Sequence, residues 1–255
     1  MGRSDTNSIG TEQSDEPKRR IGRFLKLESL SAVGLSVSLA HKNMITAKQL
    51  KADTETFLRA CGYPINPHLP PIEELAALHL ASSLDVRRRC LILASTCARA
   101  YGAKYDRVVP WIDVHELRKW CTQDEVALID ERSPTEFQKS PFRWLPESLW
   151  EFAWVLKMIP EIDHFTPCSE QLVHMFPKPG EDPTAFLSAR DIQDSELLYR
   201  EADRIYRIHW AVRDASLKGR KSPTGQEACV TECRLRAINW VMQSDILWDE
   251  VDVST

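Results

Sequence analysis

The residues best suited to chemistry lie in one predicted helix, within the stretch YRIHWAVRDASLKGR that begins at Tyr206. At about 100° per residue, His209 falls on the apolar face of this helix, and Arg213 falls at the edge of that face one turn later. A buried imidazole can act as a general base, ligate a metal or hydrogen-bond its neighbours, and burial keeps it neutral in each role. Packing is the favoured interpretation of His209.

An inward-leaning guanidinium at Arg213 needs an acceptor, because an unpaired buried charge costs several kcal/mol. The sequence offers Glu227 or Asp249 as internal acids, and an anionic ligand is the alternative. In the ligand interpretation, His209 and Arg213 join a titratable base to an anion-binding cation, with Asp249 or Asp252 nearby. The internal acid is favoured, and the catalytic candidates are His209, Arg213 and Asp249.

The C-terminal stretch SDILWDEVDVST places one indole, Trp248, among carboxylates and no basic residue. An aromatic side chain in such a segment either packs back onto the helices or anchors a partner protein. Packing is favoured here as well. The candidate partner-binding residues are Trp248, Asp249 and Asp252.

Motifs of the common enzyme classes are absent from the sequence. It contains no G-x-S-x-G, no phosphate-binding glycine loop, no H-E-x-x-H and no Rossmann fingerprint. Nine glycines in 255 residues are few, and close approach of backbone to phosphate usually requires glycine. Cys229 and Cys233 are spaced for two metal ligands, but no second pair follows. We therefore expect no metal and no cofactor.

Composition narrows the class of protein further. A chain of 255 residues, 43% hydrophobic, can bury a core without disulfides or structural metals. Seven scattered cysteines and the lack of about 18 consecutive apolar residues predict a reduced, cytoplasmic protein without a membrane span. A net charge of −4 argues against a nucleic-acid partner, despite basic patches at residues 18–26 and 87–89.

The pattern predicts a mainly α fold, with a single compact multi-helix domain over residues 46–255. Residues 1–25 are polar and are expected to form a disordered or extended tail. Residues 26–45 are an uncertain segment, either a strand or a short helix. Apolar residues alternate from Val33 to Leu39, which indicates a short strand that a second copy of the chain could pair with to form a homodimer.

Apolar periodicity and residues that start or end helices predict where the helices lie. The first ends at Gly62, and a nearly all-apolar helix between Pro146 and Pro160 is predicted to be central and buried. Two long helices, about 195–218 and 226–242, are expected to be antiparallel neighbours. On the first of these two, i,i+4 charge pairs are expected on a solvated face, namely Glu196 with Arg200 and Asp203 with Arg207. Capping boxes are predicted at 122–125 and 133–136.

Four separated stretches, GYPINPHLPPIE, YRIHWAVRDASLKGR, RAINWV and WDEVDVST, resemble domain-of-unknown-function family 4272. The likeness runs in the same order from roughly Lys48 to Thr255. It implies a mainly helical bacterial domain with no activity or catalytic residue to transfer. The resemblance emphasises His209, Trp210, Asp214, Asn239, Trp240, Trp248 and Asp249.

Two functions follow from these observations. The leading hypothesis is an intracellular, non-enzymatic interaction module whose groove or acidic C-terminal end binds another protein. The alternative is an enzyme or a small-ligand or anion-binding protein with a pocket around His209 and Arg213.

Overall fold

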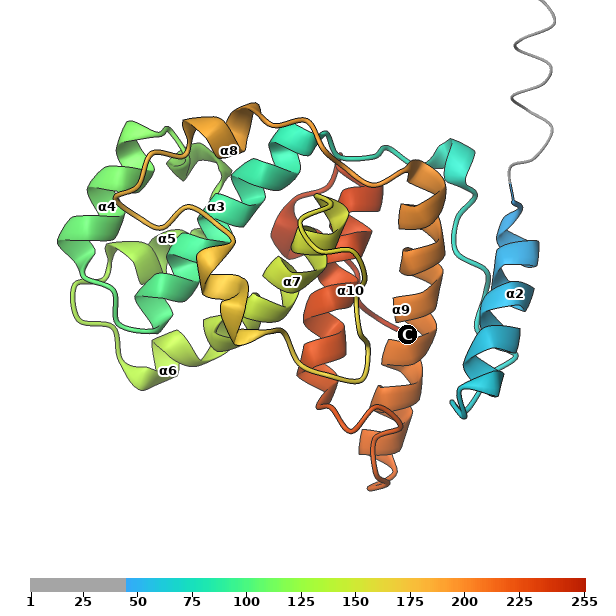
Figure 1. The fold of residues 1–255 in the computed structure, drawn as a ribbon. Coiled ribbons are helices and arrows are strands. Elements are labelled where there is room, and N and C mark those ends of the chain that lie inside the picture. Colours follow the sequence, from blue (N-terminus) through green and yellow to red (C-terminus); the bar gives the residue numbers. More distant parts are fainter. Residues whose placement is uncertain (1–44) are drawn as a thin grey trace, which may run out of the picture. The chain divides into compact units, whose positions relative to one another are not determined.

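The structure, a computed structural model, describes residues 45–255 (Figure 1). The chain is mainly helical in that range, which confirms the predicted fold class. Within it, β pairing is limited to an isolated bridge between His79 and Gln243. None of its helices is both long and apolar enough to cross a bilayer. The tail over 1–25 and the strand predicted from Val33 to Leu39 lie outside the described residues.

Most helices are joined by short turns, but long connectors over 61–82 and 156–183 join α2 to α3 and α7 to α8. The bounds of the helices are α2 (Ala47–Ala60), α3 (Ser83–Ala100), α4 (Tyr105–Val114), α5 (Gln123–Asp130), α6 (Glu136–Lys139), α7 (Leu145–Val155), α8 (Thr184–Ser188), α9 (Ser195–Leu217) and α10 (Ala228–Met242). The 3-10 turns that matter below are η2 (Arg118–Trp120), η4 (Glu170–His174) and η5 (Trp248–Glu250).

The two long C-terminal helices organise the packing. Helix α10 lies between α9 and α7, and α2 covers the other side of α9 (Figure 1). Helix α3 packs on α7 and carries α4 and α5 on its far side. Helix α7 is buried along almost its whole length, with Phe152 and Val155 fully enclosed, as predicted for a helix that is apolar all round.

Local sequence explains most helix ends, and one predicted cap is displaced. Gly62 follows α2 with φ +84°, a conformation that favours glycine. The capping box predicted at 122–125 is present, with Thr122 and Glu125 bonding reciprocally. The box predicted at 133–136 is wrong by two residues, because the Thr135 hydroxyl caps α6 and Gln138 completes the box. This later start leaves the preceding proline outside the helix.

The charged face predicted for α9 is confirmed at Glu196 and Arg200, which pair at 2.7 Å in contact with solvent, and is wrong at Asp203 and Arg207. The pair between Asp203 and Arg207 forms at 2.7 Å, but these residues are 0% and 3% exposed rather than solvated. Arg207 also donates to the carbonyl of Pro70 at 3.3 Å and lies 3.5 Å from Glu55 of α2. Helix α2 and the connector after it pack over this face. The periodicity of α9 cannot predict this contact, because it depends on a distant segment of the chain.

A buried guanidinium joins α10 to α7 and to the loop that follows α7. Arg234 is 0% exposed, and its Nε and Nη2 donate to Oε2 of Glu147 at 3.0 and 2.7 Å. Its remaining donors bind the carbonyls of Asp163, at 2.7 Å, and Thr166, at 2.9 Å. Oε1 of Glu147 accepts the backbone N–H of Cys168 at 3.0 Å. Every polar atom of this pair is therefore engaged.

Removing the Arg234 guanidinium is expected to destabilise the domain strongly. In Arg234→Met the Glu147 carboxylate stays buried without its cation, and two carbonyls lose their donor. Breaking such a buried pair costs about 3–5 kcal/mol, which urea unfolding followed by circular dichroism would measure.

The matched control is Arg236→Met on the same helix. Arg236 is partly exposed and lies 3.7 Å from Glu232, so its loss should cost about 1 kcal/mol or less. Equal losses in the two variants would contradict the structural role given to Arg234.

Candidate functional site

His209 points inward, as predicted, and is 1% exposed between α9 and α10. Its Nδ1 lies 2.8 Å from the hydroxyl of Thr231, and that hydroxyl donates to the carbonyl of Ala228 at 3.0 Å. Because the hydroxyl proton is directed to Ala228, we assign the imidazole proton to Nδ1, which donates to Thr231. Burial, with a smaller contribution from the cation of Arg213, lowers the pKa of His209 to about 4. The imidazole is therefore neutral near pH 7.

This lowered pKa predicts a pH-dependent contribution to stability. In the unfolded chain His209 takes up a proton near pH 6.5, whereas the folded chain does so only near pH 4. Stability from this group is therefore present above pH 6.5 and is lost as pH falls toward 4. The loss amounts to up to about 3 kcal/mol. His209→Gln should lower the free energy of unfolding at neutral pH, because the hydrogen bond to Thr231 is lost or altered. The variant should also lack the decrease in stability that protonation of His209 causes at acid pH.

Urea unfolding at several pH values between the two pKa limits would test the prediction. The informative quantity is the difference between the variant and the unmodified protein, which isolates His209 from other titrating groups. A difference that does not change with pH would contradict the assignment of a neutral, buried imidazole.

Arg213 does not lean inward, which corrects the expectation from its place at the edge of the apolar arc. The residue is exposed, and within residues 45–255 it forms no ion pair with Glu227 or Asp249. A long side chain at the edge of a helix face can carry its charge to water, so no internal acid is needed. His209 is enclosed, Arg213 faces solvent, and Asp249 lies exposed beyond α10, so these three residues do not line one open pocket.

The C-terminal segment folds back onto the helices. Trp248 is 8% exposed, and its ring packs 5.9 Å from that of Phe152 and 6.1 Å from that of Trp240. Asn239 donates to the carbonyl of Asp252 at 2.9 Å and holds the end of the segment. The favoured interpretation of Trp248 as a packing residue is confirmed, while the carboxylates of Asp249 and Asp252 remain exposed.

Beside Trp248 lies a groove of about 450 Å³, which we call the C-terminal groove. It runs between α3, the segment around η2 and the segment after α10. Its main lining residues are Arg88, Arg89, Trp120, Trp240, Leu247, Trp248 and Asp249. Trp120 is 47% exposed and Leu247 is 64% exposed, so an indole and an isobutyl group stand open to solvent there. The sequence predicted Trp248 and Asp249 as candidate site residues but not Trp120. The reason is that α3 and η2 contact the C-terminal segment only in the folded protein.

Buried Arg89 holds the walls of the C-terminal groove together. It is 4% exposed, forms a buried ion pair with Glu125 and donates to the carbonyl of Trp120 at 3.2 Å. Its guanidinium also lies 5.1 Å from the ring centre of Trp248. One cation therefore contacts the η2 segment, α5 and the C-terminal segment at once.

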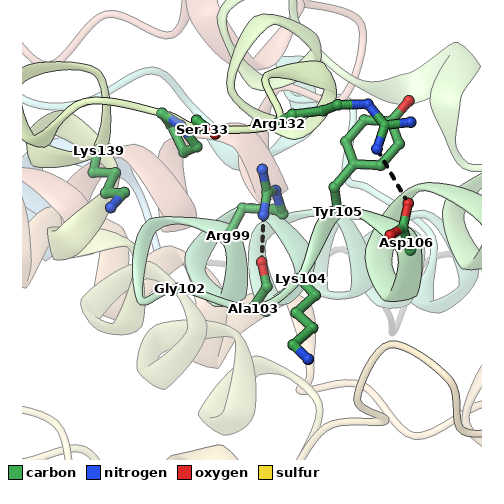
Figure 2. A pocket seen from close by; sticks show the side chains of 10 residues that line it. Arg99, Gly102, Ala103, Lys104, Tyr105, Asp106, Arg132, Ser133 and Lys139 are labelled. Carbon is green, nitrogen blue, oxygen red and sulfur yellow. Dashed lines mark hydrogen bonds and ion pairs between the residues drawn. The ribbon is translucent and has the colours of Figure 1, made fainter.

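A second pocket, of about 460 Å³, opens where α3 turns into α4 (Figure 2). Its basic side chains are Arg99, Lys104, Arg132 and Lys139. Arg99 is 3% exposed and donates to the carbonyls of Ala103 and Glu131, as Figure 2 shows for Ala103. Arg132 lies over the ring of Tyr105 at 4.2 Å and 3.5 Å from the carboxylate of Asp106. Two of these four cations, Arg99 and Arg132, are thus engaged in contacts at the turn.

The family model described as a domain of unknown function (DUF4272) matches residues 50–251. The chain belongs to the DUF4272 family. The resemblance seen in the sequence is confirmed, and the matched range contains His209, Trp248 and the walls of the C-terminal groove; Asp252 falls just beyond it. No curated protein and no solved structure matches the chain significantly.

The DUF4272 domain also buries a carboxylic acid, Glu151, that was not among the residues predicted from the sequence. Glu151 of α7 is 0% exposed, and within residues 45–255 neither of its carboxyl oxygens has a hydrogen-bond partner. Burial, strengthened by the nearby carboxylate of Glu201, raises its pKa well above the ordinary value, and Arg234 and Arg204 offset this only in part. The clue was the presence of two glutamates, Glu147 and Glu151, in a helix that is otherwise largely apolar. Among residues 45–255, no group of three or more potential ligand side chains could hold a metal ion.

Glu151 is expected to make the domain less stable as pH rises. Its unfolded pKa is near 4.5 and its folded pKa is higher, so between the two values only the folded state keeps the proton. Stability from this group is full below pH 4.5 and is lost as pH rises through the folded pKa. Glu151→Gln mimics the neutral acid. Its melting temperature relative to the unmodified protein should increase from about pH 5 to about pH 8.

The control is Glu161→Gln, which changes an exposed carboxylate just beyond α7. Its difference from the unmodified protein should stay flat over the same pH range. If Glu151→Gln were equally flat, the acid would be ionised in the folded state and the argument from burial would fail.

Proposed function

We propose that this DUF4272 protein is a non-catalytic interaction module that binds a segment of a partner protein in the C-terminal groove. The occupant is an exposed peptide segment in which an aromatic or aliphatic side chain stands next to a lysine or arginine. The observation that carries the proposal is that Trp120 and Leu247 are exposed to solvent beside the exposed carboxylate of Asp249, all on one groove.

The apolar part of the proposal depends on Trp120 and Leu247. Large apolar side chains at the rim of a groove can be covered by a partner side chain, and tryptophan and arginine dominate the energetics of protein interfaces. The guanidinium of Arg88 lies 5.2 Å from the ring centre of Trp120, so the indole already stacks on one cation. An aromatic partner side chain can extend this stack.

The charge of the occupant follows from the ion pairs around the groove. Arg88 pairs with Asp85 at 3.2 Å, and Lys119 pairs with Glu116 at 3.1 Å. Asp249, by contrast, has no ion-pair partner within residues 45–255. The net charge left for a partner is therefore negative, and it favours a basic residue on the bound segment.

Binding is better supported here than catalysis. The thiol in the groove belongs to Cys121, and burial raises its pKa to about 11, so it is not a thiolate nucleophile at neutral pH. A catalytic or anion-binding site around His209 has weaker support, because the imidazole is 1% exposed and Arg213 points to solvent.

Selection from a random peptide library displayed on phage would test the proposal. Enriched peptides should combine Trp, Phe or Leu with a neighbouring Lys or Arg. Trp120→Ala and Leu247→Asp should each weaken binding of a selected peptide by about tenfold or more, since each removes an anchor contact. Asp249→Lys should shift the selected peptides toward acidic residues. Fluorescence anisotropy would measure the affinities.

Phe137→Ala is the matched control, because Phe137 is 88% exposed on α6 and does not line the groove. It should leave peptide affinity unchanged. Failure to enrich any peptide, or equal binding by Trp120→Ala and the unmodified protein, would rule out the groove as the interaction site.

A further inference from the structure

A third cavity also borders the α3–α4 turn, and we call it the apolar pocket. Its volume is about 480 Å³, within the range of about 300–1,000 Å³ typical of small-molecule sites. Its apolar lining comes chiefly from Ala94, Cys97, Ala98, Leu149, Leu172 and Phe176. Prolines 146, 177 and 179 add further apolar surface.

Small residues on α3 leave this space open. Ala94, Cys97 and Ala98 follow one another at helical spacing and are only half-buried, so they present little side-chain bulk to the facing segment. The facing wall is held in place, because Glu147 accepts the backbone N–H of Cys168 and is itself bound by Arg234. The pocket is therefore preformed, and a ligand need not order it.

The two thiols in the lining behave as apolar groups. Burial raises the pKa of Cys97 to about 12 and that of Cys168 to about 12. Both are neutral at physiological pH, so neither is an activated nucleophile. The interior is suited to reversible binding of an aliphatic or aromatic body.

Two cations, Arg107 and Lys178, stand at the mouth of the pocket. Nε of Arg107 donates to the carbonyl of Pro179 at 2.6 Å, which fixes the guanidinium at the rim. Its two terminal nitrogens form no hydrogen bond or ion pair within residues 45–255. Lys178 is exposed and forms no ion pair in the same range. Glu170 is the one acid in the lining, so the mouth carries a net positive charge.

We propose that the apolar pocket binds a small amphipathic acid. Its hydrocarbon body occupies the space between α3 and the 168–179 segment, and its carboxylate meets Arg107 and Lys178. A guanidinium binds a carboxylate through two parallel hydrogen bonds, which the free terminal nitrogens of Arg107 can supply. This site is separate from the C-terminal groove and from the function proposed for it.

Calorimetric titration of the full chain with octanoate and decanoate, below their micellar concentrations, tests the proposal. Each methylene that enters the pocket should increase affinity about fourfold, so decanoate should bind about fifteenfold more tightly than octanoate. Decylamine has the same chain and the opposite charge, and it should bind at least tenfold more weakly than decanoate.

Substitutions place the binding in this pocket. Lys178→Glu and Arg107→Gln change exposed side chains, and each should weaken decanoate binding about tenfold. Ala98→Phe fills the interior and should abolish binding. Lys48→Glu, which makes the same charge change at an exposed position on α2, is the control and should leave affinity unchanged, as should Trp120→Ala in the C-terminal groove.

The proposal is overturned if decanoate does not bind, if decylamine binds as tightly as decanoate, or if Lys178→Glu and Lys48→Glu behave alike. If Ala98→Phe does not fold, the two mouth variants still decide the outcome. Trp120→Ala is expected to weaken peptide binding and to leave decanoate binding unchanged. The proposals for the apolar pocket and the C-terminal groove can therefore be rejected independently.

Discussion

The buried ion pair between Arg234 and Glu147 is the interaction on which the arrangement of the domain depends. Four donated hydrogen bonds from one guanidinium join α10 to α7 and to the loop after α7. Burying two charges is costly, and the cost is offset only when every polar atom finds a partner. Full satisfaction therefore restricts the three segments to one relative placement, and that placement also fixes the wall of the apolar pocket through Cys168.

A second buried guanidinium has the corresponding role on the other side of α3. Arg89 contacts Glu125, the carbonyl of Trp120 and the ring of Trp248, so it joins segments that are far apart in the chain. The C-terminal groove exists because this cation holds its walls, while the indole of Trp120 stays open at the rim. The contacts of Arg89 that stabilise the fold thus also form the groove that we propose binds a partner.

Two other buried ionisable groups, His209 and Glu151, remain neutral rather than paired. His209 is kept unprotonated by burial, and Glu151 is kept protonated by burial and a neighbouring acid. Their contributions to stability have opposite dependence on pH, so the domain combines an acid-sensitive group with a base-sensitive one. The thiols lining the pockets are likewise neutral, which suits a domain that binds rather than one that reacts.

The sequence by itself determined the mainly helical class, the long helices α9 and α10, the central position of α7, the inward direction of His209 and the packing of Trp248, because these follow from local periodicity and local capping. It did not predict α4, whose sequence contains Pro110. The predicted inward direction of Arg213 was wrong, because a side chain at the edge of the apolar face can reach solvent. The capping box at α6 was placed two residues too early, because two hydroxyls compete for the cap. Asp203 and Arg207 were predicted to be solvated but are covered by α2. Trp120, Arg107 and Lys178 carry no local pattern that marks them as site residues. Only the tertiary structure decided their role, because a groove or a pocket mouth is formed by segments whose meeting depends on long-range packing and not on the spacing of residues along one helix.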